Sequence, residues 1–298
     1  MQEYVIITDS ASDINAVQAT EWDVNVISMK YLSNGESFVN NPDHSEYPVP
    51  EFYKTLKDGA KVSTSAINVG DFMDFFSPFL KEGKDILYVC FSSGLSATYQ
   101  NALNARAELL EEYPDRAIEV VDSICASFGE GLLVYLCSEQ KKLGASLKEV
   151  RDYANETKHN VCHEFTVDDL NQLKRGGRIS SAAAFFGSML QIKPMLFVDE
   201  NGKLASYDKV RSRRLALRKL ADMLLGEIDT SKDAPIFISH ADCEDDVNAV
   251  IDMIKEKLPN AKFVVNYIGP VIGAHSGYKT LAVFCIGQGR GQARLNQS

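Results

Sequence analysis

The sequence predicts an α/β protein in two parts, an N-terminal parallel sheet and a C-terminal α+β part with a mixed sheet. Short, continuously apolar segments alternate with helical patterns through the first half, as in parallel sheets with right-handed crossovers. In the second half, Asp199-Glu200-Asn201-Gly202 between two strand-like segments is a strong hairpin signal. A length of 298 residues suits two domains. We expect them at residues 1–165 and 166–298.

The elements of the first half follow from these patterns in order. The segment ILYVCF at residues 86–91 is the clearest buried strand, and Gly59 suits the position just beyond a helix. The polar segment 92–100 opens a long helix that ends at Tyr113. We expect strands at residues 4–8, 24–32, 86–91 and 117–122, a loop at 40–50, and further helices at 51–58, 71–81, 128–142 and 147–159.

The second half mixes hairpins with helices, which is typical of α+β architecture. A basic, glycine-bearing turn, residues 174–178, precedes a helix of small residues at 181–190. A glycine-rich loop follows the strand that ends near Ile268. We expect strands at residues 162–167, 193–198, 203–209, 236–239, 263–268 and 281–286, and helices at 211–227 and 245–257.

Composition excludes several classes of function. The formal net charge of −10 repels nucleic acid phosphates. The six cysteines form no CxxC pair, so we expect neither a zinc site nor disulfides, and interpret them as small core residues. No segment approaches the roughly 18–20 apolar residues of a membrane-spanning helix. The chain starts directly with a strand-like segment, so we expect no signal peptide and a cytoplasmic location.

Three polar loops stand at strand-to-helix transitions, where open α/β sheets place ligands: residues 63–65, 92–96 and 273–277. The first two also suit helix capping, so a purely structural role stays open. Free N–H groups at a helix start bind anions, and Gly94 allows close approach of the backbone. His275 lies between glycines and can donate to an anion.

Several catalytic motifs are absent. The hydrolase pattern G-x-S-x-G is broken, because Gly94-Leu95-Ser96-Ala97-Thr98 lacks its last glycine. The glycines at 287–291 precede no helix, and no P-loop is present. A basic cluster at residues 209–219 is either a solvated helix face or a docking patch for an acidic partner.

Taken in order, five motifs resemble those of the DegV family over residues 3–287. They are Asp9-Ser10-Ala11-Ser12-Asp13, Ser63-Thr64-Ser65, the segment SSGLSATY at 92–99, Arg175-Gly176-Gly177-Arg178, and Gly273 with His275 and Gly277. The resemblance implies a Rossmann-like N-terminal domain and an α+β C-terminal domain. It also implies one buried long-chain fatty acid as the ligand, no cofactor, and, in some bacteria, a separate fatty acid kinase that makes the acyl phosphate.

The resemblance also assigns residues by motif. It implies that Thr64 and a serine of the 92–96 turn, Ser96 or else Ser93, hold the carboxylate, with His275 near it. We add Ser65 and Gly94 of the same loops as ligand-binding candidates. Arg211 matches a position linked to kinase docking, and we add Arg213. The family often has T-S-Q-P-S where this chain has Thr64-Ser65-Ala66-Ile67-Asn68, so the loop chemistry beyond Thr64 differs.

The small-residue segment 182–190 is our candidate for the wall of a tail channel, with Ala183, Phe186 and Leu190 facing the acyl chain; ordinary helix packing is the alternative. Burying about 14 methylenes of a C16 chain contributes about 11 kcal/mol gross, so the tail supplies most of the affinity. We expect a binding protein and not an enzyme. The alternatives are a serine esterase or thioesterase using Ser96 and His275, and a lipid-sensing regulator without a kinase.

Overall fold

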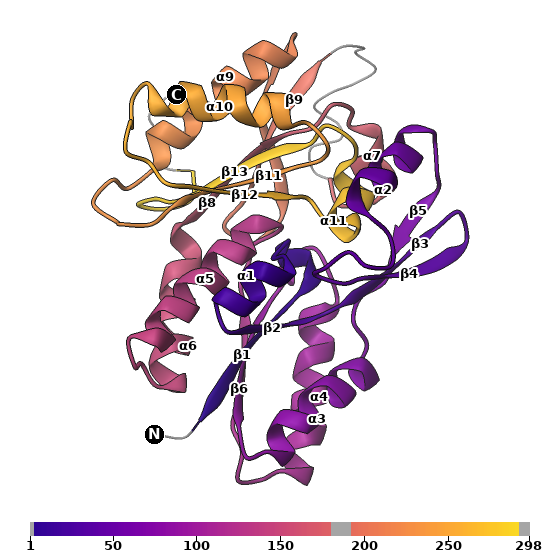
Figure 1. Cartoon of the computed structure of the whole chain (residues 1–298), viewed down its shortest axis with the longest axis vertical. Coiled ribbons are helices and arrows are strands. Elements are labelled where there is room, and N and C mark those ends of the chain that lie inside the picture. Colours follow the sequence, from indigo (N-terminus) through magenta and orange to yellow (C-terminus); the bar gives the residue numbers. More distant parts are fainter. Residues whose placement is uncertain (1–2, 180–191, 292–298) are drawn as a thin grey trace.

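Three β-sheets and the helices that cover them make up the fold (Figure 1). The computed structural model describes residues 3–179 and 192–291. The N-terminal half builds a four-stranded sheet and a small three-stranded sheet, and the second half builds a six-stranded sheet. This agrees with the α/β class that the sequence predicts.

The four-stranded sheet is wholly parallel, in the order β2-β1-β6-β7. Its strands are β1 (Tyr4–Asp9), β2 (Val24–Ile27), β6 (Asp85–Cys90) and β7 (Ile118–Asp122). Every residue of β1 and β6 is buried, because helices cover both faces. The pair α3 (Val69–Lys81) and α4 (Thr98–Glu112) packs on one face, and α5 (Phe128–Lys142) with α6 (Leu147–Thr157) on the other (Figure 1).

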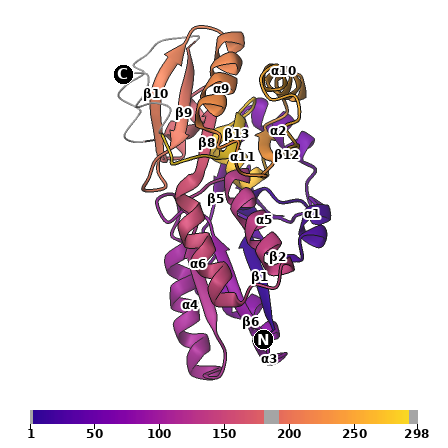
Figure 2. The same ribbon diagram turned by 90° about the vertical axis from the view of Figure 1, so that its left-hand side faces the viewer.

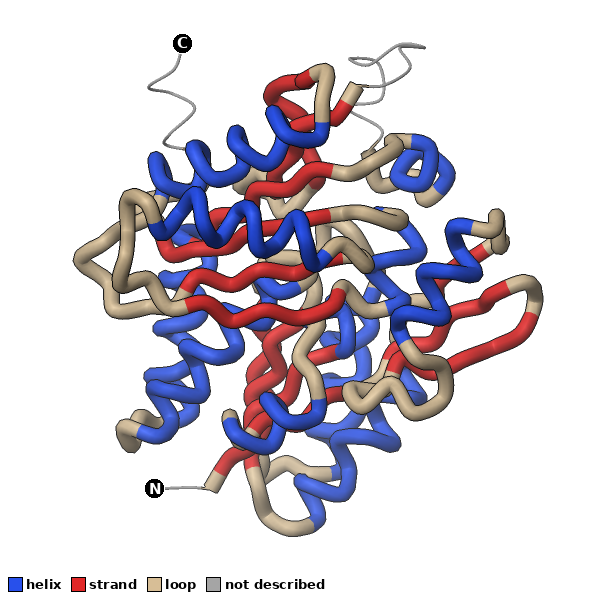
Figure 3. Tube along the Cα trace, turned by 45° about the horizontal axis from the view of Figure 1, so that its top comes forward, coloured by secondary structure: helices blue, strands red, loops and turns tan. Residues whose placement is uncertain are grey.

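The six-stranded sheet has the order β10-β9-β8-β13-β11-β12, and only β11 and β12 pair in parallel. Helices α9 (Arg213–Glu227) and α10 (Glu244–Lys255) cross one face (Figure 3), and α5 packs against the other. Because α5 contacts both large sheets, it joins the two halves. The strands are β8 (Val161–Thr166), β9 (Lys193–Val198), β10 (Leu204–Val210), β11 (Ile236–His240), β12 (Phe263–Tyr267) and β13 (Leu281–Ile286).

The small sheet corrects one prediction. Residues 24–32 are not one strand, because the chain breaks at Ser28 and passes from β2 into β3 (Met29–Ser33) of another sheet. The Ser28 hydroxyl donates to Asn41 Oδ1 at 2.9 Å at this break. Strands β4 (Glu36–Asn40) and β5 (Val62–Thr64) flank β3 and were not expected.

Short helices complete the fold: η1 (Ser10–Ser12), α1 (Ala16–Glu21), α2 (Val49–Lys57), η2 (Lys158–Asn160), α7 (Asn171–Arg175) and α11 (Pro270–Ser276). The glycine-rich loop expected at 273–277 is wrong, since most of it is the end of α11; Pro270 in the first turn is well placed to start a helix. The predicted division at residue 165 falls inside β8, which pairs only within the six-stranded sheet. The expected helix at 181–190 lies outside the described residues.

Candidate ligand-binding site

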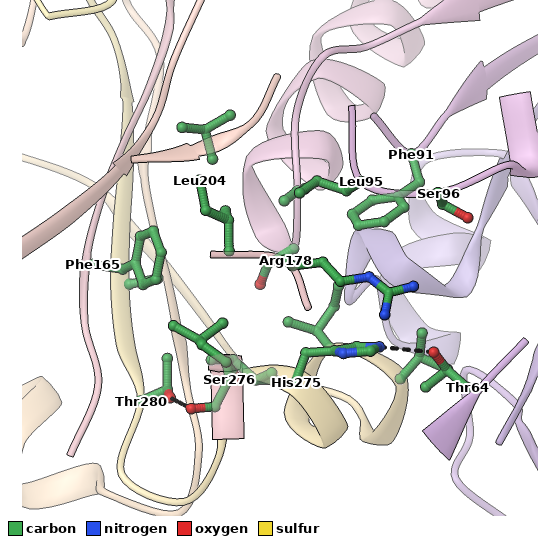
Figure 4. A pocket seen from close by; sticks show the side chains of 18 of the residues that line it. Thr64, Phe91, Leu95, Ser96, Phe165, Arg178, Leu204, His275, Ser276 and Thr280 are labelled. Atoms are coloured by element: carbon green, nitrogen blue, oxygen red, sulfur yellow. Dashed lines mark hydrogen bonds between the residues drawn. The ribbon is translucent and has the colours of Figure 1, made fainter. Parts of the chain in front are cut away.

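A cavity with about 1040 Å³ of empty space, open solvent at its mouth included, lies where the three sheets meet (Figure 4). Strands of the six-stranded and three-stranded sheets, and the loops that follow the four-stranded sheet, contribute apolar side chains to its wall, among them Met29, Phe91, Phe165, Val198, Leu204 and Phe284. Figure 2 shows from the side how the strands of the six-stranded sheet lie above those of the four-stranded sheet. An apolar cavity with few polar groups is the usual form of a small-molecule site.

A polar contact at this cavity joins Thr64 to His275, with 2.8 Å between the threonine Oγ1 and the histidine Nε2 (Figure 4). Thr64 ends β5, where it is paired with Tyr31 of β3. His275 lies in the last turn of α11, which packs against β5. Two segments 211 residues apart in sequence therefore meet at one hydrogen bond.

The His275 imidazole is neutral near pH 7. Burial, followed by the positive charge of Arg178, lowers its pKa to about 4. Its Nδ1 is buried and has no hydrogen-bond partner among the described residues. At the polar end of the cavity the ring therefore forms its hydrogen bond through Nε2 alone among the described residues.

A second hollow, the outer cleft, lies on the other side of this pair. We define it by Lys61, Arg175, Arg178 and the residues around them, with about 790 Å³ of empty space, open solvent included. Thr64, Arg178 and His275 line both spaces, so they form the boundary between them. No acidic side chain is found among the described residues that line the cleft. It is therefore suited to an anion.

Ser96 lines the cavity, as do Ser65 and Ala97. The Ser96 hydroxyl lies 2.8 Å from the Thr98 hydroxyl and accepts from the Thr98 N–H at 3.2 Å. Helix α4 begins only at Thr98, later than the segment suggested. The N-cap position of this helix is Ala97, so Ser96 is not the capping residue, although its hydroxyl accepts from the first N–H of the helix and also stands at the cavity.

Ser93 and Gly94 of the same loop face away from the cavity. The exposed Ser93 donates through its hydroxyl to Asp122 Oδ2 at 2.5 Å and through its N–H to Oδ1 at 3.1 Å. Gly94 does allow a close approach, but to the β9–β10 hairpin: a Cβ there would lie 2.8 Å from the Asn201 carbonyl oxygen and 2.9 Å from that of Gly202. Neither residue lines the cavity wall.

The candidate docking residues differ from each other. Arg211 is exposed, and so are Arg214, Leu215 and Arg218 on the outer face of α9. Arg213 instead turns inward, where its guanidinium lies 2.8 Å from Asp246 Oδ2. All three expected tail-lining residues lie outside the described residues: Ala183, Phe186 and Leu190.

The sequence reasoning did not select Arg178 or the aromatic wall as part of the site. Arg178 lies in the basic turn at residues 174–178. A cation in a glycine-bearing turn was the sequence signal that could have identified it as a site residue. Phe165 and Phe284 sit in apolar strands and Phe91 directly follows one; in such segments a residue that lines a cavity has the same pattern as one that fills the core. Their role had no sequence signal.

Metal chemistry has no support in the described ranges, 3–179 and 192–291, where no group of three or more His, Cys, Asp or Glu side chains is arranged to hold an ion. The six cysteines are free and buried, as expected. In the same part of the chain, no helix is both long and apolar enough to cross a membrane.

Residues 3–288 match the family described as "Uncharacterised protein, DegV family". The chain belongs to the DegV family. A DegV domain-containing protein of Clostridium perfringens is 43% identical over 287 residues, which cover 96% of this chain and 98% of that relative. The resemblance inferred from the motifs is therefore confirmed.

Two solved DegV structures are similar along their whole length. A DegV family protein of Thermus thermophilus, described for its fatty acid binding, is 27% identical, with a TM-score of 0.84 and coverage of 96% of this chain and 100% of that one. DegV of Bacillus subtilis, described as a fatty acid binding protein, is also 27% identical, with a TM-score of 0.83 and the same coverage. Both confirm the DegV fold.

Proposed function

We propose that this DegV protein binds one long-chain fatty acid in the cavity, with the carboxylate at Thr64, and presents it to a separate kinase that forms the acyl phosphate. The observation that carries the proposal is an apolar cavity that ends at a half-buried, neutral hydroxyl–imidazole pair. Solved relatives of the same fold are described as fatty acid binding proteins.

The cavity wall suits an acyl tail. Aliphatic and aromatic side chains from two sheets and from the loops after the third surround the space, and each buried methylene contributes about 0.8 kcal/mol. Association and ordering of the ligand offset several kcal/mol of this gain. The tail therefore supplies affinity, and the polar end needs only to satisfy the carboxylate, because an unpaired buried charge is costly.

The head-group contacts follow from the tautomer of His275. Among the described residues only Thr64 lies within hydrogen-bonding reach of the ring, so the imidazole proton is best used on Nε2, donating to Thr64 Oγ1. The threonine hydroxyl then keeps its own proton for a carboxylate oxygen. Ser96 and Ser65 stand at the same cavity and can donate beside it.

The outer cleft supports presentation to a kinase. A carboxylate at Thr64 has the acyl tail on its apolar side and Lys61, Arg175 and Arg178 on the other. These cations suit the added phosphate of an acyl phosphate, which carries more negative charge than the carboxylate. Arg211, just before α9, and the exposed arginines of that helix are the proposed docking surface for an acidic face of the kinase.

A hydrolytic function finds less support in the geometry. The Ser96 hydroxyl pairs with Thr98, while the imidazole of His275 pairs with Thr64. The buried Nδ1 has no carboxylate to orient it among the described residues, and a Ser–His pair needs such an orienting group.

The test is native mass spectrometry of the gently purified protein, followed by titration of the delipidated protein with palmitate and oleate. We expect the mass of one long-chain fatty acid on the protein and 1:1 binding of at least one of these acids. Absence of co-purified lipid, together with no binding of either acid, would contradict the proposal. The kinase step is tested by pull-down of an ATP-binding partner, which Arg211→Ala should weaken.

A further inference from the structure

The buried loop at residues 9–13 has a role that cavity and cleft do not explain. Its residues Asp9, Ser10, Ala11, Ser12 and Asp13 are at most 7% exposed, and none of them lines either space. Buried polar groups are costly unless they are hydrogen-bonded, so the partners of this loop show what it holds in place.

Asp9, at the end of β1, holds the start of the Ser96 loop. Its Oδ2 accepts from the Phe91 N–H at 3.0 Å and from the Tyr88 hydroxyl at 2.8 Å. Phe91 is the first residue after β6, and the chain runs directly from it into the turn that carries Ser96. Two donors on one carboxylate oxygen fix the point where this turn leaves the sheet.

Ser10 holds the small sheet. Its hydroxyl oxygen accepts from the Met29 N–H at 2.9 Å, at the first residue of β3. Strand β3 in turn pairs with β5, where Tyr31 stands opposite Thr64. The serine therefore fixes the strand on which the register of Thr64 depends.

Asp13 holds the helix that carries His275. Its Oδ1 accepts from the Gly269 N–H at 2.8 Å, and its carbonyl oxygen accepts from Asn266 Nδ2 at 2.8 Å. Gly269 is the residue directly before α11. The fit is close, since a Cβ on Gly269 would lie 3.1 Å from the same Oδ1.

We propose that the loop at residues 9–13 is the positioning element of the head-group site, in which Asp9, Ser10 and Asp13 each hold the root of one segment that carries Ser96, Thr64 or His275. This inference rests on the proposed function, because it assigns those three residues to the fatty acid carboxylate. One short loop thus sets the mutual placement of groups from three separate parts of the chain. Binding geometry depends on such supporting hydrogen bonds.

The experiment compares two ligands with the same tail, palmitate and 1-hexadecanol, in the full-length delipidated protein. The measured quantity is the ratio of their dissociation constants, since a change in the tail cavity alters both and a misplaced head-group site alters mainly palmitate. Asp13→Ala and Ser10→Ala should each lower the preference for palmitate about tenfold. The reason is that a displaced head-group residue loses its hydrogen bond to the palmitate carboxylate, and a lost bond to a charged group usually has an effect of this size. Asp13→Asn, which keeps an oxygen for the Gly269 N–H, should restore most of it.

The matched control is Ser138→Ala, which removes a buried hydroxyl that donates to the Trp22 carbonyl oxygen, away from the loop. It should lower stability without changing the ligand ratio. Ligand-free spectra of 15N-labelled histidine give a second measurement: the His275 ring signals should shift in Asp13→Ala and stay unchanged in the control.

The outcomes separate the two proposals. If the wild-type protein binds both ligands equally, the assignment of the carboxylate site fails and this inference fails with it. If the wild type prefers palmitate and the folded Asp13→Ala and Ser10→Ala variants keep that preference, the positioning role alone is overturned. Should Asp13→Ala not fold, Ser10→Ala and the recovery in Asp13→Asn decide the matter.

Discussion

The inner cavity and the outer cleft share a wall but have opposite chemistry. The cavity is lined mainly by aliphatic and aromatic side chains, whereas Lys61, Arg175 and Arg178 line the cleft. Thr64, Arg178 and His275 belong to both. The difference teaches how affinity and reactivity can be separated in space: under the proposed function, the acyl tail lies on one side of the boundary and the kinase modifies the head group from the other.

The largest effect is expected from filling the inner cavity, which tests whether the acyl tail lies there. Leu204→Trp places a large ring at a wall residue of β10, so we expect palmitate binding to fall at least about a hundredfold, since most of the methylene burial is lost. Titration calorimetry measures the change. Leu32→Trp, at an exposed position of β3, is the matched control and should bind normally. Normal binding by Leu204→Trp would show that the tail lies elsewhere.

The boundary itself is tested by Thr64→Val, which keeps the shape of the side chain and removes the hydroxyl. We expect palmitate affinity to fall about tenfold to a hundredfold, because hydrogen bonds to charged groups contribute about 1.5–3 kcal/mol. The affinity for 1-hexadecanol should change by less than about threefold. Equal losses for both ligands would mean that Thr64 shapes the tail cavity and does not hold the head group.

The sequence was sufficient for the elements that depend on local pattern. The continuously apolar β1 and β6 and the hairpin at residues 199–202 are where they were predicted. It could not show that the chain changes sheets at Ser28, because β2 and β3 together look like one continuous strand in the sequence. Thr64 and His275 were both named, but only the fold brings residues 211 positions apart to 2.8 Å. Ser93 was indistinguishable from Ser96 for the same reason.

The protonation of His275 sharpens the comparison, because it reports how far this boundary ring is withdrawn from water. Its folded-state pKa of about 4 is below the usual 6.5, so the unfolded chain binds more protons between these values. Stability should therefore rise with pH across this window, being fully present above pH 6.5 and lost as the pH falls to 4. Between pH 7 and pH 5 the loss is about 2 kcal/mol.

Urea denaturation at pH 7 and pH 5 measures this contribution as the difference between the wild type and His275→Gln. The variant should lose less stability on acidification than the wild type. Identical losses would mean that the ring is exposed to water and does not form the boundary.

The cleft is tested with hexadecyl phosphate, a stable analogue of an acyl phosphate. Arg178→Ala should weaken its binding about fivefold, by loss of a charge-assisted contact, and change palmitate affinity less than about twofold. Lys54→Ala, at an exposed position outside the cleft, is the control and should affect neither ligand. A larger effect on palmitate than on the phosphate would assign Arg178 to the carboxylate instead.

The smallest expected effect is that of Ser93→Ala. Because the Ser93 hydroxyl donates to Asp122 and faces away from the cavity, palmitate affinity should stay within about twofold of the wild type, while Ser96→Ala should reduce it. A loss of tenfold or more in Ser93→Ala would mean that the turn changes conformation when the ligand binds.

The position of β13 in its sheet has a consequence for biosynthesis. It is the last strand of the described chain, yet it lies between β8 and β11. A nascent polypeptide that stops before Leu281 therefore holds β8–β10 and β11–β12 as two pieces with unpaired edges, and it lacks the Ala282 and Phe284 wall of the cavity. Under the proposed function, loading with lipid therefore awaits nearly complete translation. A ribosome-stalled fragment that ends at residue 280 should retain no fatty acid and should require chaperone protection.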